Sequence, residues 1–189
     1  MRLHLRQVLL GAAFVVAFTL SAATAHASTG ITKTGGIFSA SGRLTINASA
    51  VCDVTMNITD TTTVMKVTRR QQGTVDRVTY TNCSGGGMTD FVALVPMAIS
   101  YLAFVGTLPR PLYLRRLYRY YQRQRIFADT CLYEGDLEVQ DVFTGDELTS
   151  LVFTGGRIPR TSGGVLCPAT ISVAGTLAVA GIRPRFRLI

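Results

Sequence analysis

Apolar and polar residues alternate along several segments of this chain, and this period of two constrains the fold more than any other feature. Residues 52–59, CDVTMNIT, carry Cys, Val, Met and Ile at one parity and polar side chains at the other. Residues 75–81 are rich in strand-forming side chains, and the apolar residues of 167–179 again share a parity. Turn-forming sequences such as TGD, TGG and TSGG recur along the chain. The pattern predicts an all-β domain, either a disulfide-stapled β-sandwich or a partly open barrel.

The first 27 residues have the composition of a secretory signal peptide. Two arginines precede an apolar body at residues 8–20, and a small-residue sequence, AHA, ends at Ala27. The apolar body is shorter than the roughly 20 residues that a membrane span needs, so we expect cleavage after Ala27. The remaining 28–189 have the length of one domain. The expected organisation is a signal peptide at 1–27 and a single β-rich extracytoplasmic domain at 28–189, secreted or held at the cell surface.

Four cysteines follow this leader: Cys52, Cys83, Cys131 and Cys167. An even number of cysteines in an exported domain indicates two disulfides, for which three pairings exist. We favour Cys52–Cys83 with Cys131–Cys167, which closes one loop in each half of the domain. The chain lacks the closely spaced cysteine pairs of zinc sites, and no metal is expected.

Both histidines of the chain, His4 and His26, lie within the leader. Without an imidazole, residues 28–189 cannot build Ser-His-Asp or Cys-His catalysis or most zinc sites. We therefore expect no catalytic residue and no cofactor. One enzymatic alternative is an extracytoplasmic hydrolase that uses carboxylates alone, such as Glu134, Asp136 and Glu138. These residues lie in file along one strand, however, whereas glycosidase carboxylates face each other across a cleft.

Residues 91–109, FVALVPMAISYLAFVGTLP, contain no charge and permit two interpretations. The length and the arginines that follow would suit a single membrane span with a cytoplasmic basic flank. Two prolines, a serine and a glycine interrupt the run, and a span would leave Cys131 and Cys167 in a reducing compartment. We favour two buried strands, at about 92–95 and 98–105, joined at Pro96.

Residues 113–125, YLRRLYRYYQRQR, hold five arginines and four tyrosines. Their spacing fits one face of a helix slightly better, whereas the surrounding sequence favours a strand. On the strand interpretation the apolar and aromatic residues share one side, and Arg116 intrudes among them. The candidates for contact with an anionic partner are Arg115, Arg116, Arg119, Arg123 and Arg125.

Seven of the eleven carboxylates of the chain follow directly, between Asp129 and Glu147. Two consecutive antiparallel strands would set the arginine row against this acidic row, and opposite charges across a ladder are favourable. Such pairing, together with export, argues against nucleic acid as a partner. An anionic envelope polymer or lipid surface fits better, because 28–189 retains a formal net charge of +6 after the two leader arginines are removed.

Five short segments carry a family resemblance: VCDVTMNI, VTYTNC, ISYLAFVGTLP, CLYEGDL and CPATISVAGTLAV. Together they resemble the uncharacterised exported four-cysteine proteins of high-GC actinobacteria, over roughly residues 38–180. The resemblance implies export and a β-rich fold in which 113–125 is a strand, and it implies no catalytic residue. This chain differs in placing arginine and tyrosine there. We interpret it as a secreted or cell-surface protein with a structural or binding role.

Overall fold

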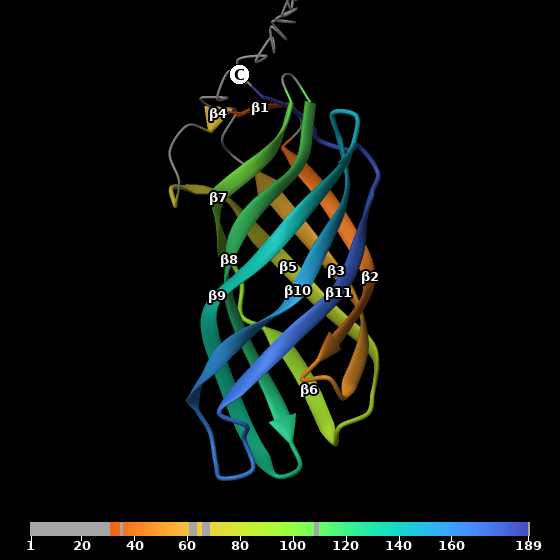
Figure 1. Cartoon of the computed structure of the whole chain (residues 1–189). Coiled ribbons are helices and arrows are strands. Elements are labelled where there is room, and N and C mark those ends of the chain that lie inside the picture. The colour runs from red at the N-terminus through yellow and green to blue at the C-terminus, as the bar shows by residue number, and fades with distance from the viewer. Residues whose placement is uncertain (1–30, 35, 61–63, 66–68, 108–109, 189) are drawn as a thin grey trace, which may run out of the picture.

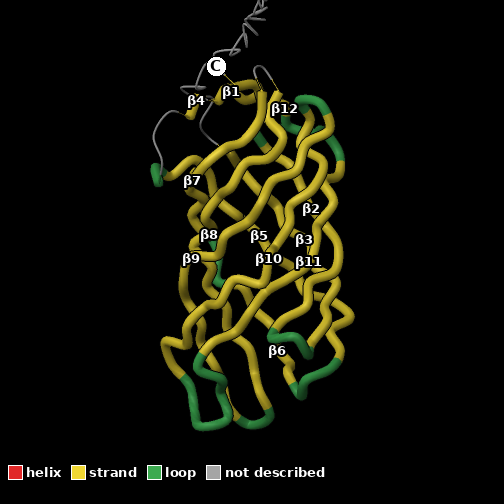
Figure 2. The backbone as a smooth tube through the Cα atoms, in the orientation of Figure 1, coloured by secondary structure: helices red, strands yellow, loops and turns green. Residues whose placement is uncertain are grey.

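The computed structural model describes residues 31–34, 36–60, 64–65, 69–107 and 110–188. The expected signal peptide at 1–27 lies outside the described residues. Every regular element among the described residues is a β-strand (Figure 2). The strands are β1 (Ile31–Thr34), β2 (Ile37–Ile46), β3 (Ala50–Asp60), β4 (Val64–Met65), β5 (Gln71–Ser84), β6 (Met88–Ala93), β7 (Met97–Thr107), β8 (Arg110–Ile126), β9 (Asp129–Thr144), β10 (Glu147–Ser162), β11 (Thr170–Ala180) and β12 (Arg185–Leu188).

Eight long strands form a closed antiparallel barrel (Figure 1). Hydrogen bonds connect them in the order β11-β2-β3-β5-β7-β8-β9-β10, and β10 pairs with β11 to close the ring. The all-β prediction is confirmed, but the sandwich is wrong, and the barrel is closed rather than partly open. A sandwich and a barrel impose the same inward and outward alternation on a strand, so the residue pattern could not distinguish them.

The pairing of β2 with β11 in the barrel wall needs glycine on both strands. A Cβ atom on Gly42 of β2 would lie 2.4 Å from the carbonyl oxygen of Thr176 on β11. Likewise, a Cβ atom on Gly175, which has a φ of +140°, would lie 2.3 Å from the carbonyl oxygen of Arg43. Because any side chain at either position would push the strands apart, these glycines permit the tight β2–β11 pairing.

Three short strands cover one end of the barrel, the upper end in Figure 1. β12 pairs with β1, β1 pairs with β4, and Glu147 of β10 pairs with Arg185 of β12. Ile31, Phe186 and Leu188 of this lid are buried against the barrel interior. We refer to β1, β4 and β12 as the lid.

The barrel interior is filled largely by side chains from alternate positions of the long strands. On β3, for example, the even-numbered residues from Cys52 to Ile58 are buried, as the alternation predicted. Apolar side chains form one continuous core along the barrel, which is the main source of stability. The inward positions also hold a few polar side chains, among them Arg116 and Asp141.

The described part of the uncharged run at 91–109 contains two strands, as favoured from its sequence, but their bounds differ from 92–95 and 98–105 and they are half-buried rather than buried. β6 and β7 lie on either side of a cis peptide bond between Val95 and Pro96, and both pair with β8. Residues 108–109 lie outside the described part. Among the residues that the structure describes, no helix is long and apolar enough to cross a membrane. Where the single-span alternative expects a helix, the described part of 91–109 pairs as strands in the barrel wall.

Candidate functional site

The arginine-rich stretch at 113–125 is part of β8, so the helical alternative is wrong. Its backbone pairs with β9 continuously from Tyr113 to Ile126. The even-numbered residues from Leu114 to Ile126 are buried, and the arginines at 115, 119, 123 and 125 lie on the outer surface. The strand thus divides its charges between two environments, with Arg116 inside the barrel.

On the outer surface, arginines of β8 pair with carboxylates of β9, as the sequence predicted. Arg115 donates through Nε and Nη2 to the two carboxylate oxygens of Glu138, at 2.6 and 2.5 Å. Arg119 donates to Glu134 at 2.9 Å and to Asp136 at 3.3 Å. These side chains are part-exposed, so each pair adds little stability, but together they neutralise the middle of this face.

The two remaining outer arginines of β8 are less well matched. Arg125 has its nearest carboxylate, Asp90, at 3.9 Å, and both side chains are exposed. Arg123 forms no ion pair with any side chain that the structure describes. Of the five arginines considered as anionic-partner contacts, Arg123 and Arg125 therefore keep the most accessible charge.

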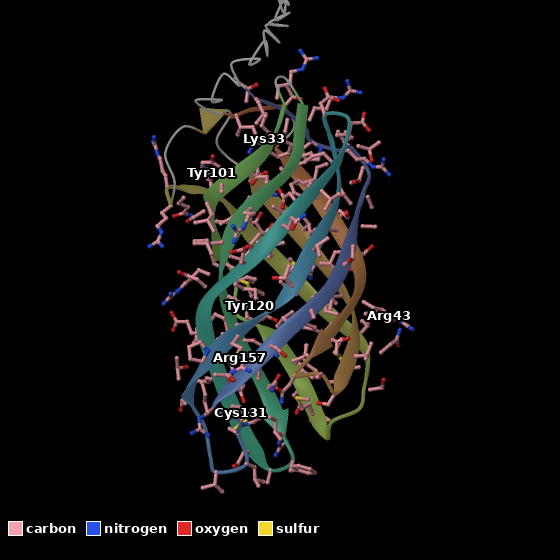
Figure 3. The ribbon with its side chains drawn as sticks, viewed as in Figure 1. Lys33, Arg43, Tyr101, Tyr120, Cys131 and Arg157 are labelled. Carbon is pink, nitrogen blue, oxygen red and sulfur yellow. A yellow bond between two sulfur atoms is a disulfide. The ribbon has the colours of Figure 1, made fainter. Side chains whose placement is uncertain are left out.

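Arg116 cannot meet a partner from solvent, because its side chain is 1% exposed. Its Nη1 donates to both carboxylate oxygens of Asp60 on β3, at 2.9 and 3.0 Å, and its Nη2 forms an ion pair with Asp141 on β9. Lys33 of the lid completes the group, with its Nζ 3.4 Å from Asp60. We call Lys33, Asp60, Arg116 and Asp141 the buried quartet; it lies beneath the lid, near the position of Lys33 in Figure 3.

Burial shifts the protonation equilibria of the quartet. Loss of solvation raises the pKa of Asp141 to about 7, although Arg116 acts in the opposite direction. Loss of solvation also lowers the pKa of Lys33, with Asp60 opposing. The pKa of Arg116 lies well above its ordinary value, because the attraction of Asp141 and Asp60 outweighs its own desolvation. With all four groups ionised, the quartet carries no net charge.

A second polar group crosses the lower half of the barrel interior. The hydroxyls of Tyr80 and Tyr120 are 2.7 Å apart, and the Tyr120 hydroxyl donates to Gln122 Oε1. Gln122 donates to Gln124 at 2.6 Å, and Gln124 donates to the sulfur of Met88 at 3.5 Å. Burial raises the pKa of Tyr80 to about 12, so these phenols stay protonated and act as hydrogen-bond donors.

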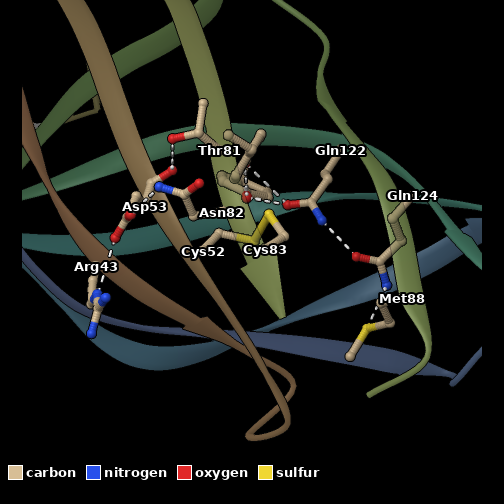
Figure 4. The surroundings of a disulfide bond; sticks show 11 residues. Arg43, Cys52, Asp53, Thr81, Asn82, Cys83, Met88, Gln122 and Gln124 are labelled. Carbon is tan, nitrogen blue, oxygen red and sulfur yellow. Dashed lines mark hydrogen bonds and ion pairs between the residues drawn. A yellow bond between two sulfur atoms is a disulfide. The ribbon is translucent and has the colours of Figure 1, made fainter. Parts of the chain in front are cut away.

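The disulfides bridge strands and a loop as the preferred pairing predicted. Cys52–Cys83 joins β3 to β5 and lies beside Gln122, Gln124 and Met88 in the barrel interior (Figure 4). Cys131–Cys167 joins β9 to the loop that follows β10. None of the four cysteines is free, and this indicates an oxidising environment.

The carboxylates considered for hydrolysis lie outside the barrel. Glu134, Asp136 and Glu138 are held by arginines on an open strand face. Asp60 and Asp141 do share a guanidinium inside the barrel, but they are nearly fully buried and no substrate reaches them in this conformation. Within the described ranges, no group of three or more His, Cys, Asp or Glu residues is arranged to hold a metal ion.

A cavity of about 190 Å³ opens at the lid. It is lined by Thr32, Lys33, Thr34, Asp146, Arg185 and Arg187. Arg185 is paired with Glu147 at 2.7 Å and Arg187 with Asp146 at 3.7 Å, so the basic rim is largely neutralised. The cavity is smaller than typical ligand pockets, and we do not assign it a ligand.

Compared with protein-family models, curated proteins and solved structures, the chain matches none. The buried quartet is the main feature that sequence reasoning missed. One sequence feature could have revealed the quartet: Arg116 is a charged residue at a position where its neighbours of the same parity are buried. In the β8–β9 register, Asp141 points to the same side of the sheet.

Proposed function

We propose that the protein is exported, acts at the cell surface or outside the cell, and has a non-catalytic role in which it binds an anionic component of the cell envelope. The barrel serves as a rigid scaffold and the accessible arginines supply the contact. The observation that carries this proposal is the surplus of arginines that remains after the carboxylates are paired.

The surplus follows from the ion pairs. All eleven carboxylate side chains lie in the described part of the chain, and nine of them pair with an arginine or lysine. The described arginines outside these ion pairs are Arg69, Arg70, Arg77, Arg123, Arg157, Arg160 and Arg183. Arginine binds phosphate, sulfate and carboxylate groups through its planar set of donors, so these residues suit an anionic polymer or headgroup.

Two further observations support an extracytoplasmic location. The paired cysteines fit an oxidising compartment, and residues 1–27 have the sequence pattern of a signal peptide. The same setting supplies anionic partners other than nucleic acid. A carboxylate hydrolase is not put forward, because its candidate acids lie in ion pairs on an exposed strand.

The proposal can be tested by binding residues 28–189 to a sulfated polysaccharide matrix and eluting the protein with increasing salt. One variant replaces five surplus arginines by glutamine: Arg69, Arg70, Arg123, Arg157 and Arg183. The matched control replaces five ion-paired arginines by glutamine: Arg43, Arg115, Arg119, Arg185 and Arg187. Both variants lose the same formal charge.

We expect the surplus variant to elute at much lower salt than the control, because its missing charges are the accessible ones. Equal elution of the two variants would show that net charge alone governs retention. That result, or the absence of any retention of the unaltered protein, would reject the proposal.

A further inference from the structure

The loop at 163–169, between β10 and β11, lies at the lower end of the barrel in Figure 1. A disulfide and four hydrogen bonds hold this loop against the barrel. Cys167 is bonded to Cys131, and the guanidinium of Arg160 donates to the carbonyls of Gly164, at 3.0 Å, and of Cys167. The Tyr133 hydroxyl donates to the carbonyl of Pro168 at 3.2 Å, and Asp129 accepts a hydrogen bond from the backbone N–H of Leu166 at 3.0 Å. These contacts restrain the loop against the end of the barrel.

This restrained loop presents apolar side chains to solvent. Val165 is 97% exposed and Leu166 is 49% exposed. Phe127, in the neighbouring β8–β9 turn, is 70% exposed, and its ring stands over Gly87, whose added Cβ would lie 3.0 Å from it. Asp129, two residues after Phe127, connects the two loops through its bond to Leu166. We call Phe127, Val165 and Leu166 the apolar tip.

Basic residues lie in the strands that lead to the apolar tip. Arg123 and Arg125 precede Phe127 on β8, and Arg157 and Arg160 precede the loop on β10. Of these four arginines only Arg125 forms an ion pair with a described side chain, with Asp90 of β6 at 3.9 Å. Asp129, at the start of β9, accepts a hydrogen bond from the loop backbone. This end of the molecule thus combines protruding apolar groups with a surplus of positive charge.

We propose that the apolar tip inserts into an anionic lipid surface, with the surrounding arginines contacting the headgroups. This inference rests on the proposed function and identifies the anionic component as a membrane. A bilayer accepts separate convex protrusions, whereas a protein partner would need a groove to match each of them. Apolar insertion and attraction to anionic headgroups reinforce each other in interfacial binding. Because the disulfide and Arg160 hold the loop, little conformational entropy is lost on insertion.

The test uses residues 28–189 and vesicles of phosphatidylcholine, with or without an equimolar amount of phosphatidylglycerol. One variant changes Phe127, Val165 and Leu166 to serine. The matched control changes Ile37 and Ile182 to serine; these apolar residues are 75% and 83% exposed. Ile37 is the first residue of β2 and Ile182 follows the end of β11, both at the lid end of the barrel. Far-ultraviolet circular dichroism and thermal unfolding confirm that both variants fold.

In cosedimentation we expect the unaltered protein and the control to bind the mixed vesicles, and the tip variant to bind roughly tenfold more weakly or worse. Binding to phosphatidylcholine alone should be weak. Equal binding of tip variant and control, or equal binding to both kinds of vesicle, would overturn the inference. A protein that self-associates through the tip, shown by a dimer that the tip variant abolishes, would overturn it in favour of a contact between copies.

An independent readout uses the absence of tryptophan from the chain. In Phe127→Trp we expect the emission to shift to shorter wavelength when mixed vesicles are added, whereas Ile182→Trp should not change. No shift in Phe127→Trp would contradict insertion. If vesicle binding fails while retention on the sulfated polysaccharide persists, this inference falls and the proposed function stands. If both fail, the proposed function falls too.

Discussion

Replacement of Arg116 by methionine tests whether the buried quartet holds the lid end of the barrel together. The guanidinium is 1% exposed and neutralises two carboxylates, Asp60 and Asp141, whose side chains are equally buried. Without it the remaining quartet carries one uncompensated negative charge. Removal of one partner from a buried ion pair typically costs about 3–5 kcal/mol, and we expect a loss of that size in the free energy of unfolding at pH 8. The loss should shrink at lower pH, where Asp141 takes up a proton.

The measurement is denaturant unfolding followed by circular dichroism, with the linear extrapolation to water. Arg115→Met is the matched control, because Arg115 is adjacent on β8, is 42% exposed and pairs with Glu138. It should lose no more than about 1 kcal/mol. The double variant Arg116→Met/Asp141→Asn leaves a neutral pair of Lys33 and Asp60, and should be more stable than Arg116→Met alone. A cost for Arg116→Met within the range of the control, or an additive loss in the double variant, would refute the reasoning.

Three further predictions concern other parts of the interior. The protonated form of Asp141 is favoured in the folded protein, so its contribution to stability is present below the ordinary pKa of 3.8 and is lost as the pH rises through about 7. Between pH 4 and pH 8 the unaltered protein should therefore lose up to about 4 kcal/mol relative to Asp141→Asn, measured by denaturant unfolding; parallel pH profiles of the two proteins would contradict this. Changing Cys131 and Cys167 to serine opens a cross-link with a sequence separation of 36 residues, and we expect a loss of about 4 kcal/mol, together with new protease cleavage within 163–169. Resistance of that loop to protease in the serine variant would show that the disulfide does not hold it. Tyr120→Phe removes a hydroxyl that donates a hydrogen bond to Gln122 inside the barrel, and it should lower the free energy of unfolding by about 1–3 kcal/mol. The control Tyr121→Phe, at the next, outward-facing position, should leave stability nearly unchanged. Similar thermal shifts for the two variants would argue against the interior network.

Local patterning allowed much of the fold to be predicted. The alternation on β3 identified a strand with a buried face, and the cysteine positions predicted both disulfides. The acidic row of β9 correctly predicted the ion pairs of Arg115 and Arg119. These features depend on neighbours along a strand or in the next hairpin, which a period of two and a turn determine.

The closed barrel could not be predicted in the same way. Closure depends on the pairing of β10 with β11 and of β11 with β2, and the second of these joins segments more than a hundred residues apart. The β2–β11 pairing requires glycine at Gly42 and Gly175 because the two backbones lie close together there. A pattern of apolar and polar residues carries no information about that distance. The same limit applies to the lid, where β1 pairs with β12 from the opposite end of the chain.

The buried quartet explains why one of the five candidate contact arginines, Arg116, was wrongly expected on the outer face of β8. Sequence reasoning treated Arg116 as one of five accessible cations, because charged residues are rarely buried without partners. Its partners Asp60 and Lys33 lie far away in the sequence and on different strands. The parity of Arg116 did match the buried face, and a search for carboxylates at the same parity of the next strand would have found Asp141.

The most direct test of the proposed role is to express the full chain in a bacterial host and to analyse the protein that a high-salt wash releases from the cell envelope. We predict a species with the mass of residues 28–189, with no free thiol, that stays with the envelope at low salt and leaves it at high salt. Full-length protein in the cytoplasm with four reduced cysteines, or protein that salt does not displace from the envelope, would contradict the account.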